Sequence, residues 1–112
     1  MSEYSKEYYR LHALVHNRRR YVNMKRYRIR NAQFMREYLN GHPCVDCGES
    51  DVRVLEFDHV TSDKVENVAT LCGQGVSLIR LKAEIAKCQV RCANCHRRRT
   101  AAQFGWWRNL GA

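Results

Sequence analysis

Proline and glycine are scarce in this sequence, and both are missing from its first 40 residues. One proline and six glycines occur among 112 residues, and all of them follow Asn40. Because both residue types interrupt helices, their absence predicts that residues 3–39 are helical. Apolar residues recur at spacings of three and four only in short patches of this segment. We therefore expect it to be largely solvated, either as one long helix or as two helices with a break near Asn17 or Asn23.

Long apolar runs are also absent. No stretch approaches the ~18 apolar residues that a membrane-spanning helix needs, and the N-terminus lacks the apolar core of a secretion signal. These features argue against a membrane or secreted protein and favour a cytoplasmic one. Without a secretion signal, the six cysteines are better interpreted as metal ligands or free thiols than as disulfides.

Acidic residues are too few to balance the basic ones. The chain has 20 Lys and Arg against 11 Asp and Glu, and residues 1–40 hold ten basic but only three acidic residues. Such an excess indicates a polyanionic partner, with nucleic acid as the default and a merely solubilising arm as the alternative. All six tyrosines also lie in residues 1–40, where they are suited to stacking on bases and sugars or simply to packing on the protein. The predicted nucleic-acid contacts of this segment are Arg18, Arg19, Arg20, Lys25, Arg26, Arg28 and Arg30.

The remaining residues alternate between short strand and helix patterns. Gly41 and Pro43 end the first helix, with Gly41 predicted in a left-handed cap. The expected elements are a strand at 53–60, a short helix at 65–71, a helix that begins after Ser77, a strand at 88–91 and a helix at 93–103 closed by Gly105. The pattern predicts an α+β fold with a basic helical extension, 1–40, and a second domain, 41–112.

Two CxxC pairs carry the strongest chemical signal. They are Cys44 and Cys47, followed directly by Gly48, and Cys92 and Cys95. Four thiolates make a closed tetrahedral zinc site, which stabilises a domain too small to have a large core. Cys72 and Cys88 do not fit this spacing and are interpreted as small buried hydrophobic residues.

A second set of residues is suited to phosphodiester hydrolysis. Asp58 and His59 lie at the end of a predicted strand, and His96 follows the second CxxC pair directly. This reaction needs a base that activates water and a divalent cation that stabilises charge on the phosphate. The arginine run 97–99 would bind flanking phosphates. The alternatives are a hydrogen-bonded turn for Asp58-His59 and a mere neighbour of the zinc site, or a zinc ligand, for His96.

The segments PCVDCG, LEFDHV and EIAKCQVRCANCHRRRT, in this order, resemble the HNH endonucleases, specifically small bacterial and phage members with two CxxC pairs. The resemblance implies a ββα-metal (His-Me finger) fold beside a structural Zn²⁺. It also implies that His59 is the general base and that Asp58 and His96 bind a catalytic divalent ion, with Mg²⁺ or Mn²⁺ expected. Duplex DNA would be cleaved by nicking or double-strand cutting in the cytoplasm of a bacterial or phage-infected cell.

One position departs from this family. Lys87 stands where the middle asparagine often lies, five residues before the second CxxC pair; Asn94 or Asn67 are the candidates to replace it. Thr100 lies where some relatives have a second histidine. The alternative function is therefore a non-catalytic, zinc-stabilised nucleic-acid-binding module. A second copy of the chain, or a phage or bacterial protein, remains a candidate partner, and Trp106-Trp107 a candidate core, dimer or DNA contact.

Overall fold

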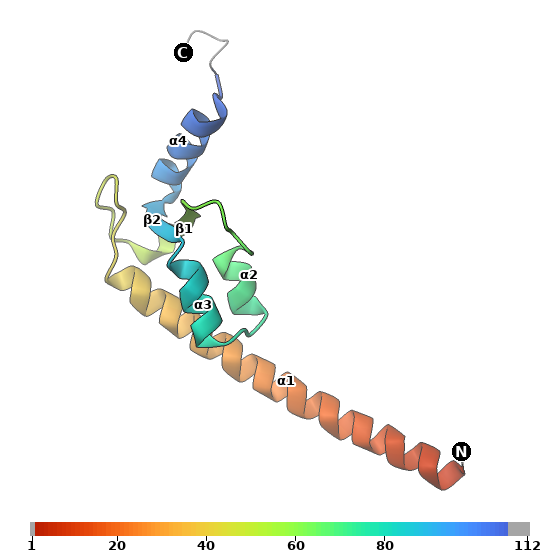
Figure 1. The fold of residues 1–112 in the computed structure, drawn as a ribbon. Coiled ribbons are helices and arrows are strands. Elements are labelled where there is room, and N and C mark those ends of the chain that lie inside the picture. Colours follow the sequence, from red (N-terminus) through yellow and green to blue (C-terminus); the bar gives the residue numbers. More distant parts are fainter. Residues whose placement is uncertain (1, 108–112) are drawn as a thin grey trace.

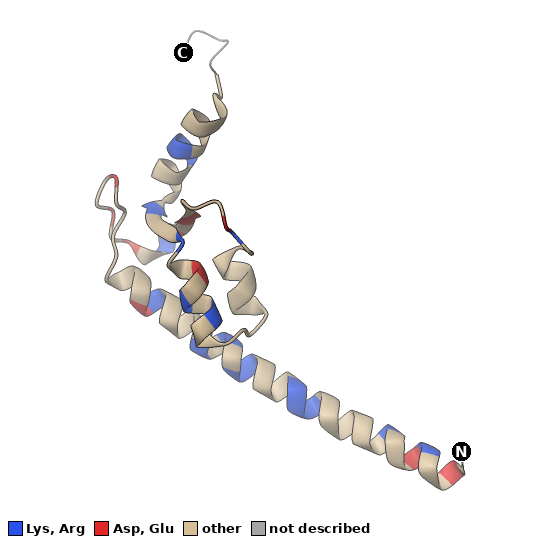
Figure 2. Ribbon diagram, viewed as in Figure 1, with Lys and Arg blue, Asp and Glu red and all other residues tan. Residues whose placement is uncertain are grey.

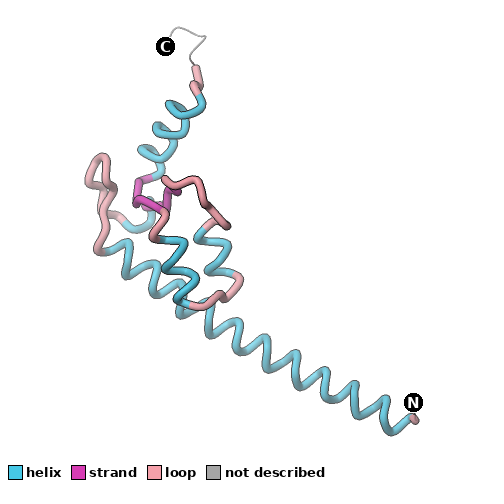
Figure 3. The backbone as a smooth tube through the Cα atoms, in the orientation of Figure 1, coloured by secondary structure: helices cyan, strands magenta, loops and turns pink. Residues whose placement is uncertain are grey.

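A computed structural model describes residues 2–107, and it confirms the expected α+β class (Figure 1). Two short strands pair in an antiparallel sheet, and helices account for most of the remaining structure (Figure 3). The elements in chain order are α1 (Glu3–Asn40), the 3-10 helix η1 (Val52–Val54), β1 (Leu55–His59), α2 (Val68–Gly73), α3 (Leu78–Ile85), β2 (Cys88–Cys92) and α4 (Ala93–Phe104).

Helix α1 is continuous, with no break at Asn17 or Asn23, and Ser2 caps its start by accepting a hydrogen bond from the Ser5 N–H at 3.2 Å. Its N-terminal half extends away from the rest of the chain (Figure 1), and the molecule measures 74 × 34 × 22 Å. Every residue in 6–22 is exposed. Lys and Arg recur along this half of the helix (Figure 2).

The C-terminal half of α1 belongs to the core. Phe34, Met35 and Tyr38 pack against the buried residues of α2 and α3, and Tyr38 with Leu39 also contacts the core that surrounds the CxxC pairs. Asn31 is completely buried and donates to the Val76 carbonyl at 3.0 Å. One face of residues 31–39 is therefore packed, whereas every residue in 6–22 of the same helix is exposed.

The sheet consists of β1 and β2, which pair in antiparallel register. Leu55 pairs with Cys92 and His59 with Cys88, so each strand is matched along its whole length. Because side chains alternate across a strand, Leu55, Phe57 and His59 lie on one face of β1, whereas Glu56 and Asp58 lie on the other. Residues that neighbour each other in sequence thus meet different helices.

Several predicted details were right. Ser77 caps α3 by accepting from the Arg80 N–H at 3.2 Å, and Gly105 closes α4 in the left-handed region with φ 67°.

Other details were wrong. Gly41 is right-handed, with φ −94°, because its N–H completes the last turn of α1. Asp51 caps η1, so β1 begins at Leu55 rather than Arg53. Helix α2 begins at Val68 rather than Val65, because the Val65 N–H donates to the Glu84 carboxylate at 2.8 Å.

Candidate metal centre and active site

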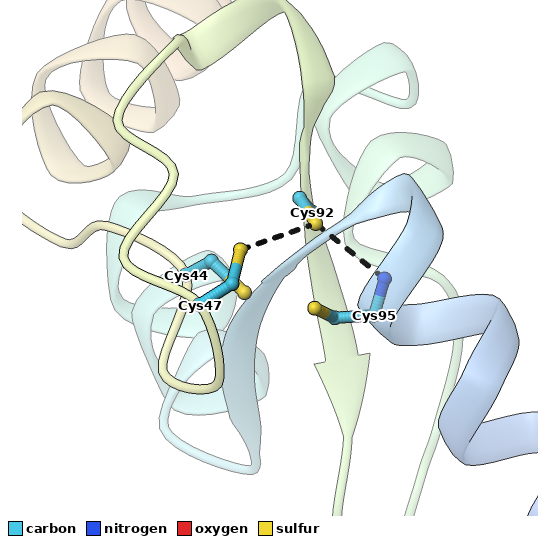
Figure 4. A group of neighbouring side chains, drawn as sticks. All are labelled: Cys44, Cys47, Cys92 and Cys95. Atoms are coloured by element: carbon cyan, nitrogen blue, oxygen red, sulfur yellow. Dashed lines mark hydrogen bonds between the residues drawn. The ribbon is translucent and has the colours of Figure 1, made fainter.

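The four thiols of the CxxC pairs meet in one cluster, although Cys47 and Cys92 are far apart in sequence. Their Sγ atoms all lie within 4.8 Å of one another, and those of Cys47 and Cys92 are 3.7 Å apart (Figure 4). Zn–S bonds of about 2.3 Å in a tetrahedron place sulfur atoms about 3.8 Å apart. The cluster therefore has a geometry suited to zinc.

Local backbone conformation brings each pair into this position. Gly48 is left-handed, with φ 80°, and its N–H donates to the Cys44 carbonyl at 2.9 Å, which closes the first turn. The Val45 N–H donates to the Val90 carbonyl at 3.0 Å and holds this turn against β2. Cys92 ends β2 and caps α4, accepting from the Cys95 N–H at 3.4 Å. A turn and a strand–helix junction thus supply two ligands each.

The thiols differ in how readily they lose a proton. Burial raises the pKa of Cys44, but backbone N–H groups of Cys92, Cys47 and Asp46 outweigh it and lower the pKa to about 6. The hydrogen bond with Cys92, together with burial, raises the pKa of Cys95 to about 12. Four thiolates this close would repel one another, so full deprotonation of the cluster requires a bound cation.

Cys72 and Cys88 lie outside the cluster, as expected, but neither is fully buried. Cys88 packs on the core formed by α2 and α3, where burial and the nearby Glu84 and Asp58 raise its pKa to about 11. Burial also raises the pKa of Cys72. The prediction that both are buried hydrophobic residues was therefore only partly right.

Asp58 and His96 face each other across β1 and α4. The buried Asp58 carboxylate lies 3.4 Å from His96 Nε2. It also accepts hydrogen bonds from Arg91 at 2.9 Å and Arg99 at 3.1 Å. On the other side of the imidazole, His96 Nδ1 lies 2.6 Å from a Glu56 carboxylate oxygen. Sequence reasoning missed Glu56, although its position two residues before Asp58 places it on the same strand face.

His59 has a different carboxylate partner. Its Nε2 lies 3.1 Å from Glu84 Oε1, and Glu84, on α3, is only 3% exposed. The second oxygen of Glu84 accepts from Lys87 Nζ at 3.0 Å, and Lys87 also donates to the Asp63 carbonyl at 2.8 Å. Burial alone would raise the pKa of Glu84, but donation by Val65, Lys87 and His59 lowers it to about 2. Glu84 is therefore an ionised, buried carboxylate that the sequence pattern did not reveal.

The remaining residues that the sequence suggested for the site are Asn94, Asn67 and Thr100. Asn94 is exposed on the first turn of α4 and makes no side-chain hydrogen bond within residues 2–107. Asn67 is exposed and accepts from Lys64. The Thr100 hydroxyl donates to the His96 carbonyl at 3.0 Å rather than facing Asp58. A cleft of about 340 Å³ lies beside His59, and its lining includes Asn67, Glu56 and Phe57.

The three consecutive arginines of α4 differ in their exposure and contacts. Arg97 is exposed and lies over the Trp106 ring, 5.4 Å from its centroid. Arg98 is exposed beside the thiol cluster, and Arg99 is bound to Asp58. Trp106 and Trp107 are 43% and 63% exposed, which excludes the interpretation that they plug the core.

The basic residues predicted on α1 are almost all available to a ligand. Arg18, Arg19, Arg20, Lys25, Arg26 and Arg28 are exposed. Arg30 is half-buried and donates to the Val76 carbonyl at 2.9 Å, which ties it to the body of the protein. Five of the six tyrosines are exposed, and Tyr38 packs on the core.

Comparisons with protein-family models, with curated proteins and with solved structures gave no match. Among the described residues, no helix is long and apolar enough to cross a membrane. The same part of the chain holds one group of three or more His, Cys, Asp or Glu side chains that could hold a metal, and that group is the thiol cluster.

Proposed function

We propose that this protein is a metal-dependent DNA endonuclease of the HNH type, in which β1, β2 and α4 form the ββα-metal unit. The observation that carries the proposal is the pairing of Asp58 with His96 across β1 and α4, with His59 next to Asp58 at the end of the strand. The thiol cluster, proposed to bind structural zinc, lies at the junction of β2 and α4.

The Asp58–His96 pair fits a divalent ion. Two donor atoms about 2.1 Å from one ion lie about 3.0 Å apart in octahedral and about 3.4 Å apart in tetrahedral geometry. The observed separation of 3.4 Å equals the tetrahedral value, and an octahedral Mg²⁺ or Mn²⁺ would bring the two atoms about 0.4 Å closer. Because the Glu56 carboxylate only accepts, its bond keeps a proton on His96 Nδ1 and leaves the Nε2 lone pair facing Asp58. With two protein donors, the pair leaves several coordination positions for water and phosphate oxygens.

In the proposed reaction, His59 removes a proton from the water that attacks phosphorus, and the 3′ oxygen leaves. When bound, Mg²⁺ or Mn²⁺ would stabilise negative charge on the phosphate and on the leaving oxygen. Arg97 and Arg98, both exposed on α4, would bind neighbouring phosphates. The exposed basic half of α1 would contact the duplex backbone away from the cleavage site.

A nicking assay on supercoiled plasmid tests this function. Zinc-loaded protein with Mg²⁺ or Mn²⁺ should convert the plasmid to the open circle, and His59→Ala should slow this by about 10²–10⁴-fold. His96→Ala should be similarly slow, whereas His16→Ala, at an exposed position on α1, should match the wild type. Equal cleavage by wild type and His59→Ala, or none by either, contradicts the proposal.

A second candidate function is a zinc-stabilised DNA-binding module without catalysis. The observation that favours it is the binding of the Asp58 carboxylate by both Arg91 and Arg99, which compete with a cation for the same oxygens. This candidate predicts salt-dependent DNA binding with no metal-dependent nicking by any variant.

A further inference from the structure

Resting on the proposed nuclease function, we infer that Glu84, held by Lys87, is the positioning residue of His59: it fixes the ring so that Nδ1 is the atom that takes the proton from water. This pair would replace the asparagine that the related sequence pattern leads one to expect at position 87. Glu84 would act through His59 and would not touch the DNA.

The hydrogen-bond chemistry of the pair determines the tautomer. Glu84 is ionised, so its oxygens only accept. Its Oε1 lies 3.1 Å from His59 Nε2, and Nε2 must therefore carry the hydrogen that is donated. In a neutral imidazole the other nitrogen, Nδ1, then bears the lone pair. A base is useful only when that lone pair is free to receive a proton.

The surroundings of Glu84 hold this arrangement in one orientation. Oε1 also accepts from the Val65 N–H at 2.8 Å, and Oε2 binds Lys87 at 3.0 Å. Lys87 continues to the Asp63 carbonyl, so the segment between β1 and α2 is tied to the same network. Glu84 is on α3, which packs on the core through Leu81 and Ile85. Helix packing thus fixes the position of the Glu84 carboxylate. The hydrogen bond between Glu84 and His59 in turn fixes the orientation of the imidazole ring.

A comparison with the other histidine clarifies the division of roles. Glu56 binds Nδ1 of His96 and leaves Nε2 toward Asp58, whereas Glu84 binds Nε2 of His59 and leaves Nδ1. Carboxylates therefore select opposite tautomers at the two sites. One tautomer suits a metal ligand next to a carboxylate ligand, and the other suits a base, because His59 Nδ1 makes no hydrogen bond within residues 2–107.

The first test is spectroscopic. Nitrogen-15 chemical shifts of the imidazole in the zinc-loaded protein distinguish a protonated ring nitrogen from one with a lone pair. Neutral His59 should be protonated at Nε2 in the wild type and should become a mixture of tautomers in Glu84→Ala. Protonation of wild-type His59 at Nδ1 would overturn the inference, and this measurement does not require cleavage.

The second test separates catalysis from binding. At saturating enzyme, single-turnover nicking should fall about 10²-fold in Glu84→Ala, while the DNA dissociation constant changes less than twofold. Glu84→Gln keeps an accepting oxygen and should retain more activity than Glu84→Ala. Lys87→Met, which removes one anchor of Glu84, should be affected less than either. On a His59→Ala background, Glu84→Ala should cause no additional loss.

The outcomes distinguish this inference from the proposed function. The positioning role is wrong, and the nuclease function stands, if Glu84→Ala cuts as fast as the wild type while His59→Ala does not cut. An additional loss in the double variant, or a change in DNA affinity alone, would make Glu84 structural. If no protein cuts, both proposals fall. Glu56→Gln is the matched control: it should raise the metal concentration needed for half-maximal nicking, whereas Glu84→Gln should not.

Discussion

The exposed half of α1 and the region around the thiol cluster represent two ways to maintain structure with little core. Residues 6–22 of α1 have no buried side chain and rely on the helix backbone itself. The region formed by β1, β2 and α4 surrounds the buried Cys44, Cys92 and Cys95, where a bound metal would replace missing apolar volume. The difference teaches that one chain can combine a solvated basic helix with a small packed region built around four cysteines whose geometry suits zinc. Substitutions in either region should therefore affect stability, metal binding or DNA binding differently.

The largest effect is expected from loss of the metal. Cys92→Ser, or removal of zinc with a chelator, should unfold the region around the sheet, because structural zinc contributes on the order of 10 kcal/mol in small domains. Metal analysis should find one zinc per wild-type chain and much less in Cys92→Ser. Cys72→Ser is the matched control and should retain the metal. Because protons compete for the thiolates, zinc affinity should fall as the pH falls.

A pair of leucines compares the two regions directly. Leu81 is 0% exposed and Leu14 is 60% exposed. Leu81→Ala should reduce the free energy of unfolding by about 2–5 kcal/mol, whereas Leu14→Ala should change it by less than about 0.5 kcal/mol. Denaturant unfolding of the zinc-loaded protein measures both. Equal losses at the two positions would mean that the exposed half of α1 is packed in solution.

Because Glu84 is buried and ionised, the free energy of unfolding should fall in acid. The pKa of Glu84 is lowered from its model-compound range to about 2. A carboxyl whose pKa is lower in the folded state stabilises the fold above its unfolded pKa, and that contribution disappears as the pH falls toward 2. Glu84→Gln should therefore reduce stability at pH 7 by about 2 kcal/mol, and the deficit should narrow between about pH 4.5 and 2. A deficit independent of pH in this range would contradict the ionised carboxylate.

The arm should influence affinity more than cleavage. Replacing Arg18, Arg19 and Arg20 by Ala should weaken DNA binding by about tenfold or more and reduce the slope of log affinity against log salt by up to about 2.7. The rate at saturating protein should remain unchanged, because these residues lie outside the body. Fluorescence anisotropy at several salt concentrations measures the slope. An unchanged slope would mean that Arg18, Arg19 and Arg20 do not contact the DNA backbone.

Local signals predicted much of the fold. Ser77 and Gly105 were correctly assigned as helix caps, because capping depends on a few adjacent residues. The boundaries of β1 and α2 were less accurate, because the Asp51 cap and the Val65–Glu84 hydrogen bond compete with strand and helix propensity. Long-range polar contacts of this kind leave no periodic pattern.

In the candidate site too, residues with a local sequence signal were predicted, and residues that depend on long-range contacts were missed. Spacing alone identified Cys44, Cys47, Cys92 and Cys95, because a CxxC turn is local and four ligands must be supplied together. The chemistry of the residues and their resemblance to the HNH endonucleases also predicted a site at Asp58 and His96, which the structure brings to 3.4 Å. Glu56 and Glu84 were missed, because single glutamates are common on exposed strands and helices. The substitution of the expected asparagine by Asn94 or Asn67 remains a prediction.

The sequence by itself determined that residues 3–39 are helical, where the two CxxC turns lie and where the basic charge gathers, since each depends on residues close together in the chain. Only the tertiary structure decided that Lys87 anchors Glu84 against His59, and that Glu56 holds His96. Those pairings depend on the register of β1 with β2, on the packing of α3 against α2 and β2, and on the contact of α4 with β1. The physical reason is that a buried carboxylate finds its partners through the positions of distant elements, which no local pattern encodes.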